Sequence, residues 1–368
     1  MTSAKSTEIS TTSAALAMLL PPGLLAETPA PQGPLPLLDV LSDVLRVVRL
    51  SGAVLFRCEF SLPWAVVTPE PADLARLVLP GAKQIMLFHL VAKGRCWIGL
   101  EGHAPLQLEA GDIVVFPYGD AHAIASDLSM EPAPLTGLLG AAMRREGMPV
   151  CVAGGGGEQT HLACGFLHCD GLLFNPLCKG LPLVIHTKGE GETAMSFLAA
   201  AVRHTVSEAG AAQPGNTCLL ARLSELLFIE VLRRHIAGLA PGAIGWLAAL
   251  NDPVVGRALQ LMHARPAQPW TVDDLARQCA TSRSRLAARF KTLLGQPPMH
   301  YLACWRLQLA AQMLRDGVHG IALIAARTGY DSEPAFNRAF KRFAGEPPAS
   351  WRAKTLAIGN TRPHFAGE

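Results

Sequence analysis

Two sets of residues have side chains and spacing suited to chemistry, and the larger set is basic and occurs twice. The segments Thr271–Pro298 and Gly320–Pro348 share one layout: a short helix, a tight turn, a second helix and Gly-x-Pro-Pro. Phe290 in the first copy corresponds to Phe340 in the second, 50 residues later. A helix-turn-helix repeated at a fixed spacing predicts a duplicated structural unit.

The second helix of each copy has an apolar face and an exposed polar face. Leu286, Phe290 and Leu293 share the apolar face in the first copy, as Phe336 and Phe340 do in the second. An exposed helix of this kind can enter the major groove of double-stranded DNA, where Arg pairs with guanine and Asn with adenine. For any single Arg, a phosphate contact or a solvated position is the alternative. The candidate DNA-contacting residues are Arg283, Ser284, Arg285, Ala288, Lys291, Glu333, Asn337, Arg338, Lys341 and Arg342.

A single helix over Pro298–Leu314 is expected to join the two copies. At 1.5 Å per residue its length is about 25 Å, and Leu302, Leu309 and Met313 can pack against both copies. Such a spacer would set the two exposed helices about one turn of DNA apart, or about 34 Å.

This region resembles the C-terminal DNA-binding domain of the AraC/XylS family of bacterial transcription regulators. The resemblance covers about 100 residues, Asp252–Trp351, and rests on WRLQLAAQMLRDG at 305–317, on IALIAARTGYDSEPAFNRAFKRFAGEPPASWR at 321–352 and on the two-copy layout. It implies DNA as the partner and RNA polymerase as a further contact. Ala287 and Ala288 stand where family members often carry large polar groups, so base readout by the first exposed helix is expected to be weak or apolar.

The second set consists of His and Cys residues in the N-terminal half. The string GDIVVFPYGDAH, residues 111–122, has the spacing Gly-x5-Pro-x-Gly-x2-His. It resembles the second motif of cupin barrels, and residues 88–100 resemble the strands that precede this motif. The resemblance covers about 130 residues, Leu50–Leu181, and implies that His122 points into a barrel.

The metal-binding pattern of cupins is incomplete, because the region of the first motif offers only His89, with neither HxH nor a matching Glu. A cupin metal is held by several N and O ligands, and one His does not make a site. We therefore expect no bound metal, no cofactor and no catalytic residues. His89, Cys96 and His122 are candidates for the lining of an effector pocket, and the alternative for His122 is a buried His with satisfied hydrogen bonds.

The string HLACGFLHCD, residues 161–170, places His161, Cys164, His168 and Cys169 close together. Alternation along a strand puts Cys164 and His168 on one face and His161 and Cys169 on the other, which does not make a zinc site. Similar Cys-Gly strands occur in oxidant-responsive relatives of the cupin–AraC group. Cys164 is therefore a candidate redox residue, and the alternative is a small buried hydrophobe.

The elements that hold these residues change along the chain. Short runs of β-branched and aromatic residues, broken by Gly and Pro, predict an all-β cupin-like barrel or sandwich after Leu50. Helical periodicity follows over 192–209 and 217–237. In the second helix, the apolar residues that must be buried are Leu219, Leu220, Leu223, Leu226, Leu227, Val231 and Ile236. One side of this helix is expected to pack on the barrel and the other to form a homodimer. The alternative is that its apolar side chains pack wholly within their own chain.

The predicted fold class is thus multidomain, with an all-β sensor, a helical dimerisation segment and an all-α double helix-turn-helix domain. The expected boundaries are a flexible extension over 1–35, the cupin-like domain over 36–190, the helical segment and linker over 191–245, and the DNA-binding domain over 251–355, with its helix-turn-helix units near 271–294 and 320–344.

Composition agrees with this division. The chain of 368 residues is 50% hydrophobic, and its net charge of +3 combines −5 over residues 1–250 with +8 over residues 251–368. A basic C-terminal module favours a polyanionic partner. Nine scattered cysteines without CxxC indicate reduced thiols and a cytoplasmic location. No apolar run of about 18 residues is present, so no membrane span is expected. The short apolar stretch at 14–20 is a poor leader peptide, because Lys5 is the only basic residue before it, Glu8 intervenes and Pro21-Pro22 ends it early.

The expected function is a sequence-specific transcription regulator of the AraC/XylS type, controlled by a small-molecule or oxidant signal at the cupin-like domain. Two alternatives stay open. One is a metal-dependent cupin oxygenase with an attached DNA-binding module, and the other is a constitutive DNA binder with a structural barrel.

Overall fold

The computed structural model describes residues 39–47, 50–78, 85–142, 148–169, 174, 176, 180–189, 197, 200, 201 and 215–360. The extension expected over 1–35, nearly all of the helix expected over 192–209 and the side chain of Cys169 lie outside this description. Among the helices in the described ranges, none is long and apolar enough to cross a bilayer.

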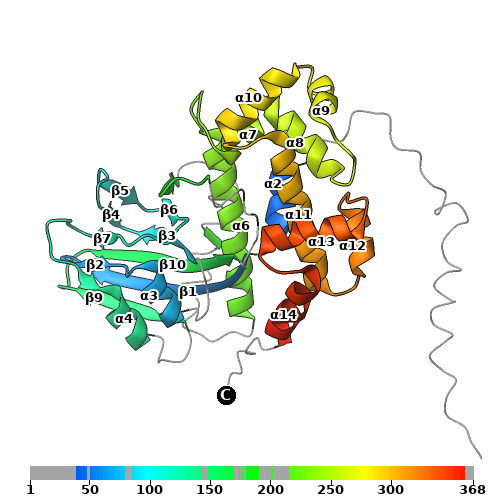
Figure 1. The fold of residues 1–368 in the computed structure, drawn as a ribbon. Helices are drawn as coiled ribbons and strands as arrows, with labels where there is room; N and C mark the ends of the chain where they lie inside the picture. The colour runs from blue at the N-terminus through cyan, green and yellow to red at the C-terminus, as the bar shows by residue number, and fades with distance from the viewer. Residues whose placement is uncertain are drawn as a thin grey trace, which may run out of the picture. The chain divides into compact units, whose positions relative to one another are not determined.

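Two β-sheets form the N-terminal region (Figure 1). The six-stranded sheet has the order β11 (Ile185–Thr187), β6 (Ile113–Phe116), β3 (Ile85–Lys93), β10 (Gln159–Cys169), β1 (Leu50–Ser61) and β9 (Val150–Gly154). The five-stranded sheet has the order β5 (Leu106–Glu109), β4 (Arg95–Gly99), β7 (Ala123–Ala125), β2 (Ala65–Val67) and β8 (Ala133–Pro134). The prediction of an all-β cupin-like domain is confirmed, with two separate sheets in place of a closed barrel.

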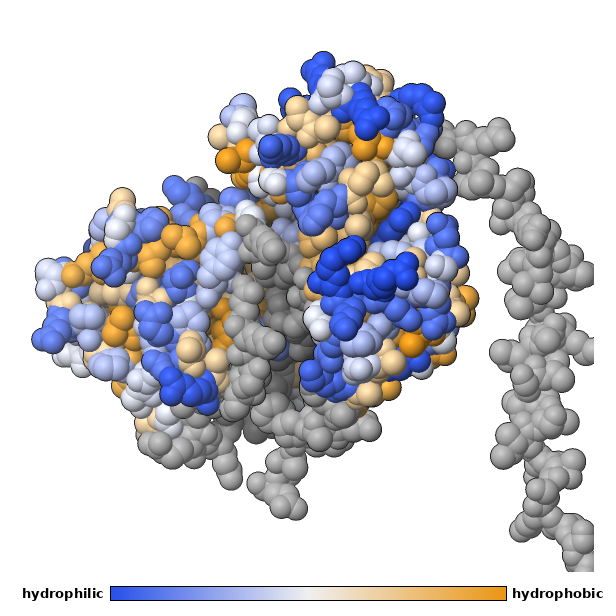
Figure 2. Space-filling model, in the orientation of Figure 1, coloured by the Kyte–Doolittle hydropathy of each residue, from blue (hydrophilic) through white to orange (hydrophobic). Residues whose placement is uncertain are grey.

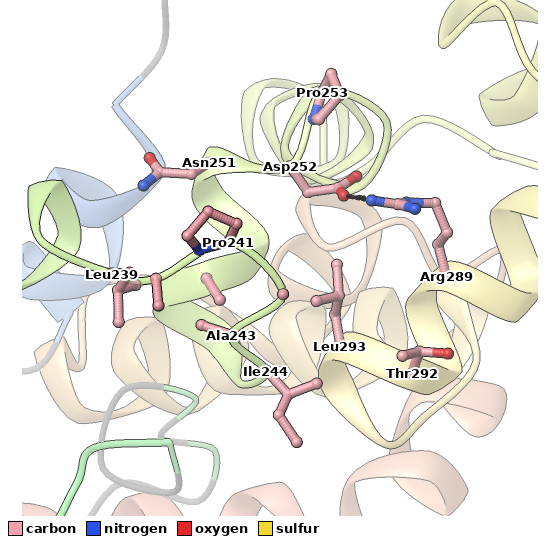
Figure 3. Close-up of a pocket in the computed structure, with 13 residues that line it drawn as sticks. Leu239, Pro241, Ala243, Ile244, Asn251, Asp252, Pro253, Arg289, Thr292 and Leu293 are labelled. Atoms are coloured by element: carbon pink, nitrogen blue, oxygen red, sulfur yellow. Dashed lines mark hydrogen bonds and ion pairs between the residues drawn. The ribbon is translucent and has the colours of Figure 1, made fainter.

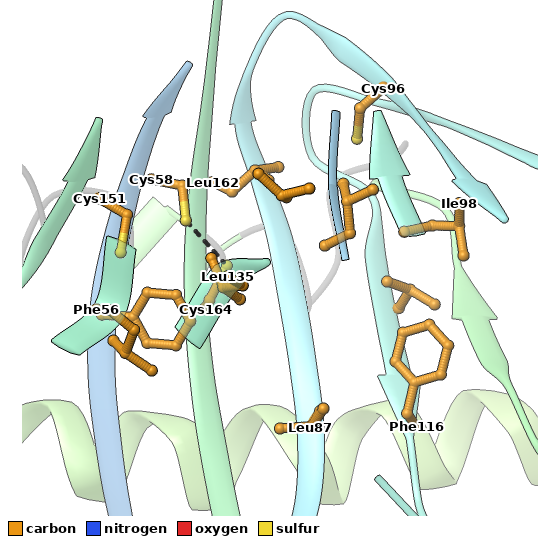
Figure 4. Close-up of a cluster of buried hydrophobic side chains, with 14 of the residues drawn as sticks. Phe56, Cys58, Leu87, Cys96, Ile98, Phe116, Leu135, Cys151, Leu162 and Cys164 are labelled. Atoms are coloured by element: carbon orange, nitrogen blue, oxygen red, sulfur yellow. Dashed lines mark hydrogen bonds between the residues drawn. The ribbon is translucent and has the colours of Figure 1, made fainter. Parts of the chain in front are cut away.

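The core of this domain is built from side chains of both sheets. β1 and β10 pair antiparallel over most of their length, and β10 also pairs with β3. Phe56, Phe116 and Phe166 belong to this core, together with Leu135 of α4 (Leu135–Ala142) (Figure 4). Two further helices, α2 (Val40–Val47) and α3 (Pro71–Val78), have one buried face each.

Helix α6 (Asn216–Ala237) packs against β1, β10 and β11. One face of the helix is buried and consists of Leu220, Ser224, Leu227, Phe228, Val231 and Leu232. Leu219 and Leu226 lie on the other side and stay about half exposed, at 50% and 49%. The structure therefore separates the apolar residues of α6 into an inner and an outer group.

The C-terminal region is entirely helical, and the prediction of a double helix-turn-helix fold is confirmed. Its helices are α7 (Trp246–Asn251), α8 (Val255–Ala264), α9 (Val272–Gln278), α10 (Arg283–Leu294), α11 (Pro298–Asp316), α12 (Ile321–Arg327), α13 (Glu333–Ala344) and α14 (Pro348–Asn360). Helices α9 and α10 form the first helix-turn-helix unit, and α12 and α13 form the second. α11 runs between them as one continuous helix.

Helix α11 contributes to the core of both units. Tyr301, near its start, is fully buried and contacts Phe290 of α10 edge to face, with ring centroids 6.4 Å apart. Leu307 and Leu314, further along, join the core that contains Phe336 and Phe340 of α13. Of the residues expected to pack here, Leu302 is buried, whereas Leu309 and Met313 are half-buried.

Candidate DNA-binding surface and sensor core

Helices α10 and α13 begin and end at equivalent residues. Ser282 and Ser332 cap their N-termini, since each side-chain oxygen accepts a hydrogen bond from the backbone amide three residues later. Gly295 and Gly345 end the two helices with φ of 69° and 81°, a left-handed conformation that Gly adopts without strain. The two helices therefore have the same length, 12 residues, and can be compared position by position.

Two of the three arginines of α10 are paired with acidic side chains. Arg283 forms an ion pair with Asp273 at 3.1 Å. Arg289 donates a hydrogen bond from Nε to Asp252 Oδ2 at 3.0 Å and a second one from Nη2. Arg285, Lys291 and Ser284 are exposed.

Asp252 links α10 to the start of α8. Its Oδ1 accepts hydrogen bonds from the backbone amides of Val254 and Val255, while its Oδ2 binds Arg289 (Figure 3). Burial opposes the charged carboxylate, but the hydrogen bonds from Arg289 and the two amides hold the pKa of Asp252 below its usual value. An open pocket lies beside this pair, lined by the linker residues 239–244 and by the last turns of α7 and α10.

The cations of α13 are unpaired by comparison. Arg338, Lys341 and Arg342 are exposed, and no ion pair joins them to an acidic side chain within residues 218–356. Asn337 is half-buried, and its Oδ1 has no hydrogen-bond partner among the described residues. Figure 2 shows strongly hydrophilic side chains gathered over α13, whereas the surface over α10 is mixed. Glu333 is exposed in the first turn, where a negative charge suits the helix dipole.

In the cupin-like domain, the structure brings together His89, His122 and Cys164. His89 of β3 lies opposite Cys164 of β10 in the sheet, with Nδ1 3.0 Å from the Cys164 Sγ. Its Nε2 lies 2.9 Å from Nε2 of His122. All three side chains are buried, and the His122 ring stacks on Phe116 with centroids 3.6 Å apart.

The contacts of His122 fix the direction of this hydrogen-bond chain. Its Nδ1 lies 2.7 Å from the backbone oxygen of Asp120, so Nδ1 carries the proton and Nε2 accepts. His89 must then donate from Nε2, which leaves its Nδ1 to accept from the Cys164 thiol. Burial lowers the pKa of His122 to about 4, and burial together with the His122 charge lowers the pKa of His89 well below its usual value. Both imidazoles are therefore neutral at physiological pH.

A second thiol, that of Cys58, lies next to Cys164, and a third, that of Cys151, lies next to Cys58. Cys58 Sγ is 4.0 Å from Cys164 Sγ, and Cys58 pairs with Cys151 across β1 and β9 (Figure 4). Burial raises the pKa of Cys58, as it does that of Cys96, which rises to about 12. Cys58 and Cys151 were not among the predicted residues, because only the strand register brings Cys58 to Cys164 and Cys151 to Cys58. No described hydrogen bond connects Cys96 to His89 or His122.

The residues present do not fit a cupin metal site. Both ring nitrogens of His89 are engaged, one by a thiol and one by His122. Within the described ranges, no group of three or more His, Cys, Asp or Glu has the geometry to hold a metal ion. His161 and His168 are half-buried on either side of Cys164 along β10 and do not join the buried chain.

Comparison with known proteins matches both halves of the chain. A model described as Cupin matches residues 39–237, and a model described as Helix-turn-helix domain matches residues 275–354. An AraC-like transcription regulator of Streptomyces antibioticus is 34% identical over 322 residues, which cover 86% of this chain and 98% of that protein. The HTH-type transcriptional regulator AlkR of Acinetobacter baylyi is 30% identical over 275 residues, 74% of this chain and 90% of that protein. A solved AraC-type DNA-binding domain protein of Chromobacterium violaceum is 29% identical, with a TM-score of 0.29, over 32% of this chain and 99% of that chain.

The chain belongs to the AraC-like transcription regulators that carry a cupin domain at the N-terminus. The family resemblance inferred from the motifs is confirmed. The cupin match extends through α6, which packs against β1, β10 and β11.

Proposed function

We propose that the protein binds double-stranded DNA through α10 and α13 and regulates transcription in response to a signal at the cupin domain. The duplicated helix-turn-helix with its exposed cations carries this proposal. The mechanism is non-catalytic: contacts to phosphates supply affinity that depends on salt, and side chains in the groove supply sequence preference. Contact with RNA polymerase and a cytoplasmic location belong to the same proposal.

Salt dependence of binding by the full chain tests the DNA-binding part. Each phosphate that a cation neutralises contributes about −0.9 to the slope of log affinity against log salt. Lys291→Ala and Lys341→Ala should each reduce the magnitude of this slope by about 1. Lys354→Ala is the control, because Lys354 lies on α14 and is paired with Glu346. Absence of DNA affinity at low salt, or slopes that both variants leave unchanged, would contradict the proposal.

We further propose that the outer face of α6 forms a homodimer. Leu219 and Leu226 are seven residues apart on one side of the helix, with half-buried Leu223 between them. A twofold dimer would present four DNA-binding helices to two half-sites. Leu227 is only 1% exposed, so a charged residue there would disrupt the fold rather than test the interface.

The variant Leu219→Asp/Leu226→Asp is therefore expected to be monomeric at micromolar concentration, with an unchanged circular dichroism spectrum. Val318→Asp serves as the control, since Val318 is an exposed apolar residue outside α6. Sedimentation velocity distinguishes the two states. A wild-type protein that sediments as a monomer with and without DNA would exclude this dimer.

Oxidation at Cys164 is the signal that the geometry of the sensor core favours. Hydrogen peroxide would transfer one oxygen to the Cys164 sulfur, giving a sulfenic acid and one water. The Cys58 thiol would then condense with the sulfenic acid to a disulfide and release a second water. The two sulfurs, 4.0 Å apart, must approach to about 2.05 Å. An organic effector at His89, Cys96 and His122 is the other candidate. The core around these residues is filled by side chains such as Phe116, so oxidation requires less rearrangement.

Peptide mapping after peroxide treatment is expected to find a Cys58–Cys164 disulfide together with a changed DNA affinity. Cys164→Ser should abolish both effects, whereas Cys218→Ser, which removes an exposed thiol on α6, should abolish neither. Peroxide-treated protein with intact thiols at both positions would exclude this signal.

A further inference from the structure

We infer that α13 supplies most of the base readout, whereas α10 anchors the first unit on the DNA backbone. This inference rests on the proposed DNA binding by both helices and assigns contacts with bases to one helix and contacts with phosphates to the other. It follows from comparing the two helices at equivalent positions.

The helices share their capping serine, their buried Phe and their terminal Gly, so each position of α10 has a counterpart 50 residues later in α13. With 3.6 residues per turn, the positions opposite the buried Phe recur every four residues. In α10 this outward line consists of Ser284, Ala288 and Thr292. In α13 the same line consists of Pro334, Arg338 and Arg342.

The central position of this line differs most. Ala288 has only a methyl group, which can contact a thymine methyl but cannot donate or accept a hydrogen bond. Its counterpart, Arg338, is exposed and has five N–H donors in a fork that matches O6 and N7 of guanine. Beside it, Asn337 stands where α10 has Ala287, but its Oδ1 is buried, so the readout on α13 rests on the exposed Arg338. The groups that distinguish bases are therefore concentrated on α13.

The ion pairs reinforce this difference. Arg283 and Arg289 of α10 are held by Asp273 and Asp252, and the latter pair ties the helix to α8 within the protein. Arg285 and Lys291 remain on the flanks of the outward line of α10, where they can reach phosphates on either side of the groove. Contacts of this kind fix the register of the protein on DNA without specifying sequence.

The preferred DNA therefore has two sites about one helical turn apart, of which the site under α13 contains guanine and has the stronger preference. Selection of bound sequences from a random DNA pool by the full-length protein tests this. Arg338→Ala should lose the guanine preference at that site, with about a tenfold fall in discrimination, and leave the other site unchanged. Arg285→Ala should weaken binding to all sequences alike. Ala288→Arg should add a guanine preference at the weaker site.

Two equally strong sites in the wild-type selection would overturn the inference, as would a loss in Arg338→Ala that is uniform over all sequences. No enrichment over the random pool would instead contradict the proposed DNA binding itself. Since Ala288 and Arg338 are exposed, circular dichroism should show that both variants are folded.

Discussion

Phe340→Ala is expected to lower the free energy of unfolding of the second helix-turn-helix unit by about 3–5 kcal/mol. The Phe340 side chain is fully buried and lies in one core with residues of α11 and α12. Its ring centroid is 5.6 Å from that of Phe336 and 6.1 Å from that of Trp351 on α14. Small domains are stable by only about 5–15 kcal/mol, so the variant should lose much of its ordered α13 and most of its sequence preference on DNA.

Urea unfolding followed by circular dichroism measures this loss. Phe343→Ala is the matched control, since Phe343 lies on the same helix but is half-buried at the edge of the core. Phe343→Ala should lower the free energy of unfolding clearly less than Phe340→Ala does. Equal losses for the two variants would show that Phe340 does not have the central place in the core that its burial indicates.

Acidification is expected to destabilise the cupin domain between about pH 6.5 and pH 4. In the unfolded chain a His binds a proton near pH 6.5, but in the fold burial lowers the pKa of His122 to about 4. The unfolded state therefore binds more protons in this range, and the stability present above pH 6.5 is lost as the pH falls. His122 alone accounts for about 2 kcal/mol between pH 7 and pH 5, and His89, whose pKa is also lowered, adds to this.

The measurement is the free energy of unfolding at pH 7 and pH 5 for the wild type and His122→Gln. The variant should be less stable at pH 7 but should show a smaller change between the two pH values. Burial also lowers the pKa of His263, which contributes equally in the wild type and the variant. The difference between the two proteins in the pH-dependent change of the free energy of unfolding therefore reports on His122. His300→Gln, at an exposed position on α11, should keep the full wild-type dependence. An unaltered pH dependence in His122→Gln would contradict the assignment.

The helical half of the protein could be predicted closely because its signals are local. Serine caps, terminal glycines and apolar periodicity lie within a few residues of the elements that they define. Because the helix-turn-helix occurs twice, equivalent positions of α10 and α13 can be matched from the sequence alone. The Asp252–Arg289 pair could not be predicted in this way, because it joins residues 37 positions apart across two helices.

In the cupin domain, the contacts around the candidate residues could not be predicted from short sequence patterns. Cys164 was recognised as a candidate, but its neighbours depend on the register of β10 against β1 and β3, which the sequence does not reveal. On α6 the apolar residues run around much of the helix, so periodicity alone could not decide whether Leu226 or Leu227 meets the sheet. By contrast, residue types alone show that the metal-ligand pattern of the first cupin motif is incomplete.

The continuous helix α11 has a consequence for how operators can evolve. Two DNA-binding modules joined by a flexible tether tolerate variable distances between their sites, because effective concentration changes only gradually with tether length. Here the joint is a helix of 19 residues that forms part of both cores. Inserting about half a turn of DNA, roughly 5 base pairs, would turn the second site to the opposite side of the duplex. Substitutions of single base pairs in an operator can therefore accumulate, whereas insertions or deletions that change the distance between its two sites would abolish simultaneous binding by both helices.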